Sequence, residues 1–582
     1  MLKSIITRFA LTVTIIIPAI SFSQDTTDVS WGEGTPGTLE AAITGPGVYR
    51  LEAGKVYLTV EHIPVETGAI HIVGATPADG VHPATIQPYV NAEGVLGHSN
   101  GELFTVVGDN AELALKGLIL NGASFGGEGS LHGCASARGA MNKVIVENCV
   151  ISHIAHLAFF TMGTKTDFHI TNNVIKSFTN GPGGMFYGGV VWGAGSWMGT
   201  IGKLEARNNT IDGVIGEAFV IYERVDHGSV IDHNTFTNIV MNCVWYRGQN
   251  NLSVTNNLFY NTKSYGQSTY DASGWGVWYP GGVGQMSVRP ADTVDYWMSD
   301  GQFVNMHDRN IHYGNNAFAW SDAMVDWVNT LSAAPWSWEV TTVTVDTTTG
   351  DTTTVVTTQW DTMLTVAQQA IWIDDTTLTT IAQNTGVTQD NNAGVTDLGM
   401  NLDEAYITHQ LARTLDFRDD QTTQGVGANN QWMYEHDDSY TNIEWPMYYD
   451  ASYSSSSVAA THCTHGGPVG ATRWMDHAES LDTDNSINLP KAFALKQNYP
   501  NPFNPSTDIV FDLEKSSTIN LTVFNVLGQK VKVLANGSKQ AGTHTVNWDG
   551  RDEMGATVST GLYFYTLTDG NNSVTKKMAL MK

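Results

Sequence analysis

Cysteine is scarce in this chain of 582 residues, which contains only Cys134, Cys149, Cys243 and Cys463. Exported domains that depend on disulfides carry many more cysteines for their length. We therefore exclude a disulfide-stapled scaffold and interpret the four thiols as buried, apolar side chains.

Cations are scarce as well, because 29 lysine and arginine residues stand against 57 acidic residues and give a formal net charge of −28 at pH 7. Nucleic acids are excluded as partners, since phosphate binding requires a cationic surface. The same negative field opposes a polyanionic sugar unless local cations or bound Ca²⁺ reverse it.

Long apolar runs are missing too. The run from Phe9 to Ile20 is shorter than the roughly 20 residues that span a bilayer, and no later run is long enough. It follows Lys3 and Arg8 and precedes a small-x-small sequence at Ser21–Ser23, a pattern typical of a signal peptide. We expect a cleaved signal peptide over 1–23, no transmembrane segment after its removal, and a protein that is secreted or displayed on the cell surface.

The middle of the chain has no helical periodicity and instead contains a repeated segment. KVIVENCVI, FHITNNVI, KLEARNNTI, SVIDHNTF, LSVTNNLF and IHYGNNAF each contain a short alternating strand, an Asn and another apolar pair. Three of the five separations between the recurring asparagines are 23 to 25 residues, and the other two are one unit plus an insertion. These asparagines are Asn148, Asn173, Asn209, Asn234, Asn257 and Asn316.

A unit of this length with two or three short strands cannot bury its apolar face alone, so successive units must stack. The repeat therefore predicts an all-β fold, a right-handed parallel β-helix over residues 24–335. Asn tolerates positive φ, and its amide can bond to the same Asn of the next coil. We expect each recurring Asn to form a left-handed turn and a rung of such a ladder.

The first coils carry a family resemblance. The stretches GTLEAAITGPGVYRLEAGKVYLTV and LFTVVGDNAELALKGLILNGA resemble the opening of the pectate-lyase-like β-helix superfamily. A short helix at Leu39–Ile43 is expected to cap the open end of the solenoid. Superfamily members that cleave acidic polysaccharides work on the face of one parallel sheet, so the resemblance implies a polysaccharide as partner.

Two insertions, at 180–195 and 264–302, interrupt the coils. Long loops on a rigid scaffold are common positions for binding surfaces, and flat aromatic side chains suit the apolar faces of sugar rings. Trp275 and Trp278 of the second insertion are therefore candidate substrate-binding residues. The alternative is that these aromatic residues only pack over the coil.

The segment YERVDHGSVIDHNTF, residues 222–236, concentrates charge in a chain in which only 15% of residues are charged. When positions are counted back from the recurring asparagines, the sequence YER at 222–224 aligns with WYR at 245–247 in the next coil. Equivalent positions of neighbouring coils lie about 4.8 Å apart, so stacked arginines repel unless an anion lies beside them. The predicted pairs are Tyr222 with Trp245, Glu223 with Tyr246, and Arg224 with Arg247.

The stacked pairs have two interpretations. In a lyase, Arg224 and Arg247 bind a uronate carboxylate, and His227 or an arginine removes the adjacent proton. Glu223 and Asp226 then hold Ca²⁺, or they serve as the two carboxylates that a glycoside hydrolase needs about 5 to 10 Å apart. Alternatively, the same two carboxylates merely neutralise the arginines on the surface.

In the lyase interpretation, aromatic residues complete the site by stacking on the sugar. The candidates on the coils are Tyr222, Trp245 and Tyr246.

The region after the coils changes character. VTTVTVDTTTGDTTTVVTT around a Gly350-Asp351 turn predicts a β-hairpin over 336–360. Residues 361–480 lose the recurring Asn, and NIEWPMYYDASYSS and THGGPVGATRW resemble the closing segment of exported β-helix proteins of Bacteroidetes-like bacteria. His462, Cys463 and His465 lie too close in sequence to favour a zinc site.

The C-terminal residues 495–582 follow a linker at 481–494 and contain LKQNYPNPFNPSTDIVF and a terminal KKMALMK. Alternating strands at 519–524, 544–548 and 562–568 predict a small Ig-like β-sandwich. This region resembles the type A sorting domain of the type IX secretion system. The resemblance implies export across the outer membrane, with the type IX secretion machinery as partner.

Two functions of different classes agree with these features. The first is a secreted or cell-surface polysaccharide-active enzyme, with a lyase on an acidic glycan favoured over a glycoside hydrolase. The second is a non-catalytic extracellular protein that binds glycan or mediates adhesion through the same aromatic face.

Overall fold

The computed structural model describes residues 26–264, 296–297, 303–304, 310–423, 450–474 and 494–580, with short gaps inside these ranges that include 179–188, 194–198, 222–227 and 247–250. The expected signal peptide over 1–23 lies outside the described residues. The chain divides into two compact units, Met1–Ala478 and Glu479–Lys582. Among the described residues, no helix has the length and apolar character to cross a membrane.

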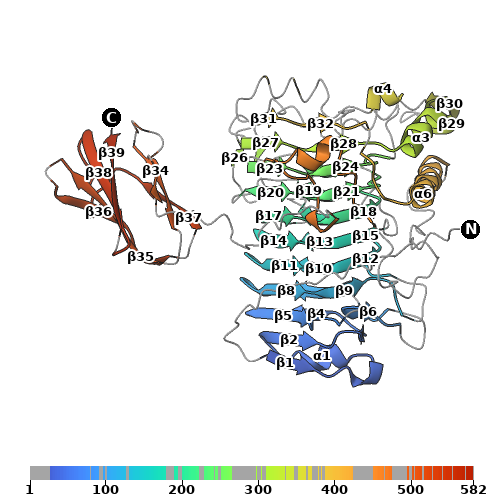
Figure 1. The fold of residues 1–582 in the computed structure, drawn as a ribbon, viewed down its shortest axis with the longest axis horizontal. Coiled ribbons are helices and arrows are strands. Elements are labelled where there is room, and N and C mark those ends of the chain that lie inside the picture. The colour runs from blue at the N-terminus through green and yellow to red at the C-terminus, as the bar shows by residue number, and fades with distance from the viewer. Residues whose placement is uncertain are drawn as a thin grey trace, which may run out of the picture. The chain divides into compact units, whose positions relative to one another are not determined.

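The first unit is a solenoid of three parallel sheets, here called A, B and C, and each full coil passes through C, A and B in turn (Figure 1). Sheet A contains β1 (Thr26–Val29), β2 (Gly47–Leu51), β5 (Ala69–Gly74), β8 (Glu112–Lys116), β11 (Lys143–Glu147), β14 (Thr166–Thr171), β17 (Ile201–Arg207), β20 (Ser229–Asp232), β23 (Asn251–Thr255), β27 (Asn310–Gly314) and β31 (Val387–Asp390).

Sheets B and C complete the coils. Sheet B contains β3 (Val56–Thr59), β6 (Ala84–Pro88), β9 (Leu118–Asn121), β12 (Val150–Ile154), β15 (Val174–Phe178), β18 (Thr210–Val214), β21 (Thr235–Thr237), β24 (Leu258–Tyr260), β28 (Ala317–Ala319) and β32 (Ala393–Gly394). Sheet C contains β4 (Ile63–Val65), β7 (Glu102–Val106), β10 (Gly133–Ala137), β13 (Leu157–Thr161), β16 (Gly189–Gly193), β19 (Phe219–Ile221) and β22 (Val244–Tyr246).

One continuous apolar core fills the solenoid. Inward side chains of all three sheets, such as Val144, Phe159 and Ile175, are fully buried in it. The N-terminal end is covered by α1 (Thr38–Ala42), whose Leu39 joins this core. This confirms the expected capping helix, shifted by one residue.

The recurring asparagines form two adjacent columns at the turn between sheets A and B, not one. The first column has left-handed backbone, with φ between 45° and 59°, at Asn148, Asn172, Asn208, His233, Asn256, Asn315 and Asn391. The second column forms the hydrogen-bond ladder, in which each side-chain amide bonds to the next, through Asn173, Asn209, Asn234, Asn257, Asn316 and Asn392.

The expectation that one Asn does both jobs is therefore wrong. Asn148 belongs to the left-handed column, and its neighbour Cys149 takes the ladder position, where its amide nitrogen donates to Asn173 Oδ1 at 2.9 Å. The expectation that residues after 361 lose the Asn is also wrong, since Asn392 extends the ladder through β31 and β32. Sequence spacing misses this coil because 76 residues separate Asn392 from Asn316.

The described residues between Asn316 and Asn392 contain the predicted hairpin, with a helix before it and another after it. β29 (Trp336–Val345) and β30 (Thr352–Asp361) pair antiparallel, which confirms the hairpin expected at 336–360. It follows α3 (Asp322–Ala333), and the short α4 (Val366–Gln369) comes after it. In a separate two-stranded antiparallel pair, β25 (Tyr296–Trp297) of the second insertion pairs with β26 (Phe303–Val304), which directly follows that insertion.

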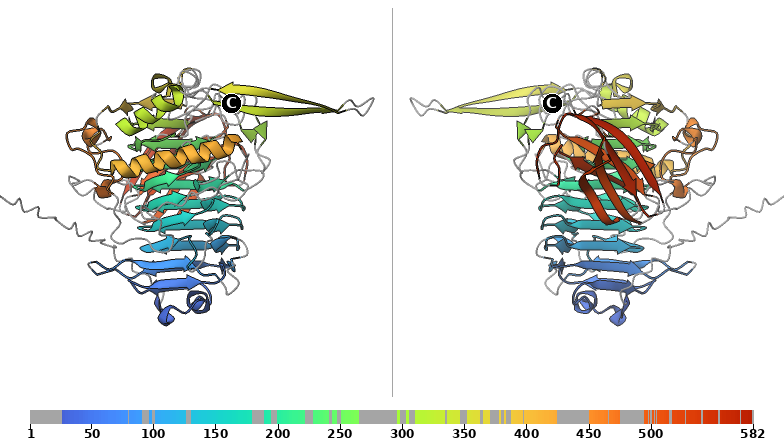
Figure 2. Two further views of the ribbon diagram at one scale, coloured as in Figure 1. Left: turned by 90° about the vertical axis from the view of Figure 1, so that its right-hand side faces the viewer. Right: turned by 90° about the vertical axis from the view of Figure 1, so that its left-hand side faces the viewer.

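Two later segments cover sheet B from outside. The helix α6 (Glu404–Thr423) lies across the coils, as Figure 2 shows in its left view. Residues 450–474, here called the strap, run over the turns between sheets A and B and include two short 3-10 turns, η3 (Val458–Thr461) and η4 (Thr472–Trp474). Gly470 of the strap has φ +88°, and a Cβ there would lie 2.5 Å from Thr235 Oγ1.

The second unit is an antiparallel sandwich. One sheet contains β33 (Ala494–Leu495), β34 (Thr507–Leu513) and β37 (Gly542–Trp548), and the other contains β36 (Lys530–Lys539), β35 (Ser517–Asn525), β38 (Gly561–Thr568) and β39 (Ser573–Leu580). Trp548, Tyr565 and Met578 lie in its own fully buried core. The structure thus confirms the all-β fold class, a parallel β-helix followed by a small Ig-like sandwich.

Candidate functional site

Most of the predicted site residues lie outside the described part of the chain. Trp245 and Tyr246 belong to β22, whose backbone is described. The predicted residues outside it are Tyr222, Glu223, Arg224, Asp226, His227, Arg247, Trp275 and Trp278. Glu223 and Asp226 therefore remain predicted Ca²⁺ ligands.

The register predicted for the stack is wrong. β19 pairs with β22 so that Trp245 lies beside Val220 and Tyr246 beside Ile221, not beside Tyr222 and Glu223. The error is two residues, because the connection from sheet C to the ladder Asn is longer in one coil than in the next. Ile221 precedes Asn234 by 13 positions, whereas Tyr246 precedes Asn257 by 11. Counting from the asparagines hides this difference.

The outer face of sheet A carries paired charges. Lys143 stacks on Glu112 and Lys116 on Glu147, with ion pairs of 3.5 and 2.8 Å. Two coils further on, the carboxylate of Glu205 forms ion pairs with Lys203 Nζ and Arg207 Nε, both at 2.9 Å. Partners of opposite sign follow one another along the coils, so this face neutralises itself. Such paired charges are typical of a solvent-exposed protein surface and do not indicate a ligand-binding site.

Basic neighbours keep Glu205 ionised. Hydrogen bonds from His169, Lys203 and Arg207 hold its pKa far below the ordinary value, although partial burial opposes them. A carboxylate this well paired cannot act as a proton acceptor near neutral pH.

The outer face of sheet B is covered by the strap and by α6. The indole of Trp474 in the strap packs against Ile119, Val150 and Val174 on successive strands. Its Nε1 donates a hydrogen bond to Thr210 Oγ1 at 2.6 Å.

Helix α6 docks through a buried carboxyl group of β18. Asp212 accepts hydrogen bonds from Thr237 Oγ1 at 2.7 Å, from Asn238 Nδ2 at 2.8 Å and from the Tyr406 hydroxyl of α6. Burial raises the pKa of Asp212, and the three donors oppose that shift. These contacts attach α6 to sheet B, so the carboxyl group has a structural role.

The outer face of sheet C holds a carboxyl group with a pKa near neutrality. Glu102 of β7 is 3% exposed, and its Oε2 lies 3.4 Å from Arg138 Nη2, just after β10. Burial raises the pKa of Glu102 to about 7, while Arg138 and Ser136 oppose the shift. The Arg138 side chain is 35% exposed, so it can also contact a ligand. Ser136 Oγ accepts from Arg138 Nε at 3.2 Å and orients the guanidinium.

A second buried carboxyl group lies near the same face. Glu217, two residues before β19, is 1% exposed, and among the described residues its Oε1 has no hydrogen-bond partner. Burial raises its pKa to about 8. A buried polar atom without a partner is costly, and carboxyl groups with strongly raised pKa values concentrate at functional sites.

The two carboxyl groups are too far apart to work together. The strands β10, β13 and β16 lie between β7 and β19 in sheet C. Four strand spacings amount to about 19 Å, whereas two catalytic carboxylates of a glycosidase lie about 5 to 10 Å apart. Glu102 and Glu217 therefore do not form a hydrolase pair.

Aromatic residues also align on sheet C. Phe160 pairs with Trp192, Trp192 with Val220, and Val220 with Trp245 on four successive strands. Phe160 and Trp192 are 8% and 3% exposed, so they pack over the coil. Trp275 and Trp278 lie outside the described residues, so the choice between sugar binding and packing stays open for them.

Sequence reasoning missed Glu102, Arg138 and Glu217. GELFTV and ASARGA each contain one charge in an otherwise uncharged run, which was the available signal. The contact between Glu102 and Arg138 depends on which residues of neighbouring coils point outward, and only the strand register shows that. Among the described residues, no group of three or more His, Cys, Asp or Glu side chains is arranged to hold a metal ion.

The fold defines a parallel β-helix protein with a C-terminal Ig-like domain, and the family model that matches this chain falls within that second domain. Residues 503–573 match the family model of the FlgD Ig-like domain. Among solved structures, dimeric latent PorU from Porphyromonas gingivalis is similar at 14% identity and a TM-score of 0.14, over 16% of this chain and 9% of that chain. A likeness this slight carries no argument. A comparison with curated proteins gives no match.

Proposed function

We propose that this is an exported β-helix protein that binds an acidic polysaccharide on the outer face of sheet C and cleaves it by β-elimination. The observation that carries the proposal is the contact between Glu102 and Arg138, in which a carboxyl group with a pKa of about 7 lies beside a partly exposed guanidinium. Sheet A neutralises its own charges, and sheet B is covered by the strap and α6. These features favour sheet C.

The proposed chemistry depends on Arg138, whose guanidinium would contact both Glu102 and the carboxylate of the sugar. Elimination from a uronic acid requires a cation that neutralises the sugar carboxylate and a base that removes the adjacent proton. Arg138 supplies the cation, and Glu102 near its pKa exists partly as base and partly as acid. A sugar carboxylate on Arg138 would weaken the pairing of Arg138 with Glu102. The pKa of Glu102 would then rise, so binding should take up protons near pH 7.

Export by the type IX secretion system belongs to the same proposal. The Ig-like sandwich at the C-terminus and the sequence resemblance of residues 495–582 to a type A sorting domain support it. The pectate-lyase-like resemblance of the first coils supports a polysaccharide as the ligand.

Non-catalytic glycan binding is the second candidate. Glu102 is only 3% exposed, which limits its contact with a sugar, whereas Arg138 is more accessible. A protein that uses Arg138 alone would bind an acidic glycan without cleaving it.

The two candidates are separated by one set of measurements. The purified protein is incubated with alginate, pectin, ulvan and glycosaminoglycans, and absorbance of unsaturated uronate is followed alongside binding. For a lyase, Arg138→Ala and Glu102→Gln should abolish turnover, while Arg50→Ala, which removes an exposed pair with Asp28 on sheet A, should not. Binding without absorbance, weakened by Arg138→Ala, supports the second candidate. Neither turnover nor binding with any glycan rejects both.

A further inference from the structure

Three of the four cysteines are inert by their surroundings. Cys134, Cys149 and Cys243 are at most 2% exposed in the core of the solenoid, and burial raises the pKa of each thiol. The thiol of Cys149 donates to the carbonyl oxygens of Leu115 and Glu147 at 3.4 and 3.3 Å. A thiol that donates to carbonyls is neutral and unreactive.

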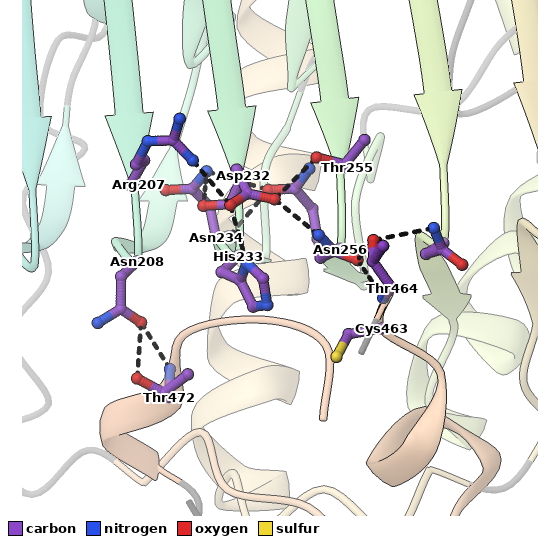
Figure 3. A network of polar contacts seen from close by, with 12 residues as sticks. Arg207, Asn208, Asp232, His233, Asn234, Thr255, Asn256, Cys463, Thr464 and Thr472 are labelled. Atoms are coloured by element: carbon purple, nitrogen blue, oxygen red, sulfur yellow. Dashed lines mark hydrogen bonds and ion pairs between the residues drawn. The ribbon is translucent and has the colours of Figure 1, made fainter. Parts of the chain in front are cut away.

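Cys463 of the strap has the opposite environment. The amide nitrogen of Gly467 donates to its sulfur at 3.0 Å. The imidazole of His233 faces the same strap turn (Figure 3), and its buried Nε2, which has no hydrogen-bond partner among the described residues, interacts electrostatically with this sulfur. Donors that point at a sulfur stabilise the thiolate over the thiol. Cys463 is 7% exposed and lies in a turn whose Thr464 and Gly466 are exposed.

His233 is held in place by a carboxylate. Its Nδ1 lies 2.9 Å from Asp232 Oδ2, and Arg207 Nη1 contacts the same oxygen at 2.9 Å (Figure 3). The other oxygen, Oδ1, accepts from Thr255 Oγ1 and Asn256 Nδ2 at 2.7 and 2.8 Å. Despite burial, hydrogen bonds from His233, Thr255 and Asn256, with His233 the strongest, lower the pKa of Asp232 to about 2.

The arrangement favours a charged imidazole. Burial alone lowers the pKa of His233, but the hydrogen bond with Asp232 and the nearby Cys463 sulfur outweigh it and raise the pKa to about 9. The facing groups are Arg207 of β17, which is paired with Asp232, and Tyr453 of the strap, whose hydroxyl donates to Val469 O at 2.8 Å. Burial raises the pKa of Tyr453, so this hydroxyl stays neutral.

We propose that Cys463 is a reactive thiolate, paired with the His233 imidazolium, and that it is a modification site for small disulfides. The thiolate attacks one sulfur of the disulfide and forms a mixed disulfide with that half. The S–S bond of the reagent breaks, and the other half leaves as a thiolate that takes a proton from His233 or from solvent. The small disulfide is the oxidant and is itself reduced. This site is independent of polysaccharide binding on sheet C.

The chain offers a matched variant. His233 occupies the left-handed column, with φ 51°, where the neighbouring coils carry Asn208 and Asn256. His233→Asn therefore suits the backbone and removes only the imidazole, and Asp232 keeps Arg207 and Thr255 as partners. Cys463→Ser removes the sulfur itself.

The test is the pH profile of thiol modification in the folded, full-length protein, with the chromogenic disulfide dithio-bis-nitrobenzoate as probe. We expect one thiol to react in the native state, and all 4 cysteines of the chain in denaturant. The native rate should stay nearly constant from about pH 8 down to about pH 6, because a thiolate persists there. In His233→Asn, the rate at about pH 6 should fall at least about tenfold, and Cys463→Ser should lose the native reaction.

Three results would overturn the proposal. The first is that no thiol reacts before unfolding. The second is a wild-type rate that falls about tenfold per pH unit below about pH 8.5, as for an ordinary cysteine. The third is an unchanged profile in His233→Asn, provided that its unfolding midpoint matches that of the wild type.

Discussion

Asparagine acts in two ways at the turn between sheets A and B, and each residue does only one of them. The left-handed column uses the tolerance of Asn for positive φ, and the ladder uses the amide as donor and acceptor. Asn234 shows the second role. Its Nδ2 donates to Ala206 O and Asn257 Oδ1, both at 3.0 Å, while its Oδ1 accepts from Asn209.

We predict that Asn234→Ala lowers the free energy of unfolding by about 1 to 3 kcal/mol, because it leaves buried donors and acceptors of both neighbouring coils without partners. Chemical denaturation of the full chain measures it. Asn392→Ala, at the half-buried last rung, is the matched comparison and should cost less. Equal costs at both rungs would contradict the expectation that burial of the unpartnered groups sets the cost.

Buried carboxyl groups on and near sheet C should make stability depend on pH. The pKa of Glu217 rises from 4.5 to about 8, so the folded state binds more protons than the unfolded state between these values. Its contribution is present below about pH 4.5 and is lost as the pH rises toward 8. Glu102 contributes in the same direction up to about pH 7.

We predict that Glu217→Gln, which mimics the protonated acid, flattens this decline and makes the variant more stable than the wild type at about pH 9. The difference should be on the order of 5 kcal/mol, since each unit of pKa difference is worth about 1.4 kcal/mol. Unfolding midpoints across pH measure it, with Glu33→Gln at an exposed position as control. A variant whose profile stays parallel to that of the wild type would contradict the buried, protonated state of Glu217.

At the scale of elements, the strap and α6 cover the outer face of sheet B, so that outward side chains of this sheet are buried. Thr464 and Thr472 of the strap donate to the left-handed asparagines Asn256 and Asn208 at 2.8 and 2.6 Å. Trp474 adds the apolar anchor. The turn column thus binds the strap with the carbonyl oxygens of its side chains, which the ladder column cannot offer because its amides bond to each other.

We predict that Trp474→Ala costs about 2 to 3 kcal/mol, because a half-buried indole and its hydrogen bond to Thr210 are lost together. The strap should also become sensitive to limited proteolysis while the coils stay resistant. Trp474→Phe keeps the apolar contact but removes the hydrogen bond to Thr210, so it separates the contributions of packing and hydrogen bonding. An unchanged cleavage pattern in Trp474→Ala would mean that the polar contacts alone hold the strap.

At the scale of the whole molecule, the two units have separate cores. The sandwich buries Trp548, Tyr565 and Met578 in a cluster of its own, and the solenoid closes its core without them. Removing one unit should therefore leave the other folded.

We predict that deletion of residues 495–582 leaves the unfolding transition of the β-helix unchanged but prevents delivery to the cell surface, which follows from the proposed sorting role. Cell fractionation and surface labelling of tagged proteins measure delivery, and circular dichroism of the purified truncation measures folding. Normal display of a folded truncation would reject the sorting role. A truncation that fails to fold would instead contradict the separation of the cores.

Local periodicity determined much of this protein from sequence alone. Alternating strands, a 23 to 25 residue repeat and a Thr-rich segment predict the β-helix, the sandwich and the hairpin, because each depends on residues that are close in the chain. The capping helix is expected from the family resemblance of the first coils. The site depends on which residues of different coils face outward side by side. A two-residue difference in one turn changes which side chains of β19 and β22 lie side by side.

Only the tertiary structure could therefore bring Glu102 to Arg138 across 36 positions, or Cys463 to His233 across the strap. The same holds for the pKa values, since burial and charged neighbours set them and both arise only when distant segments pack together.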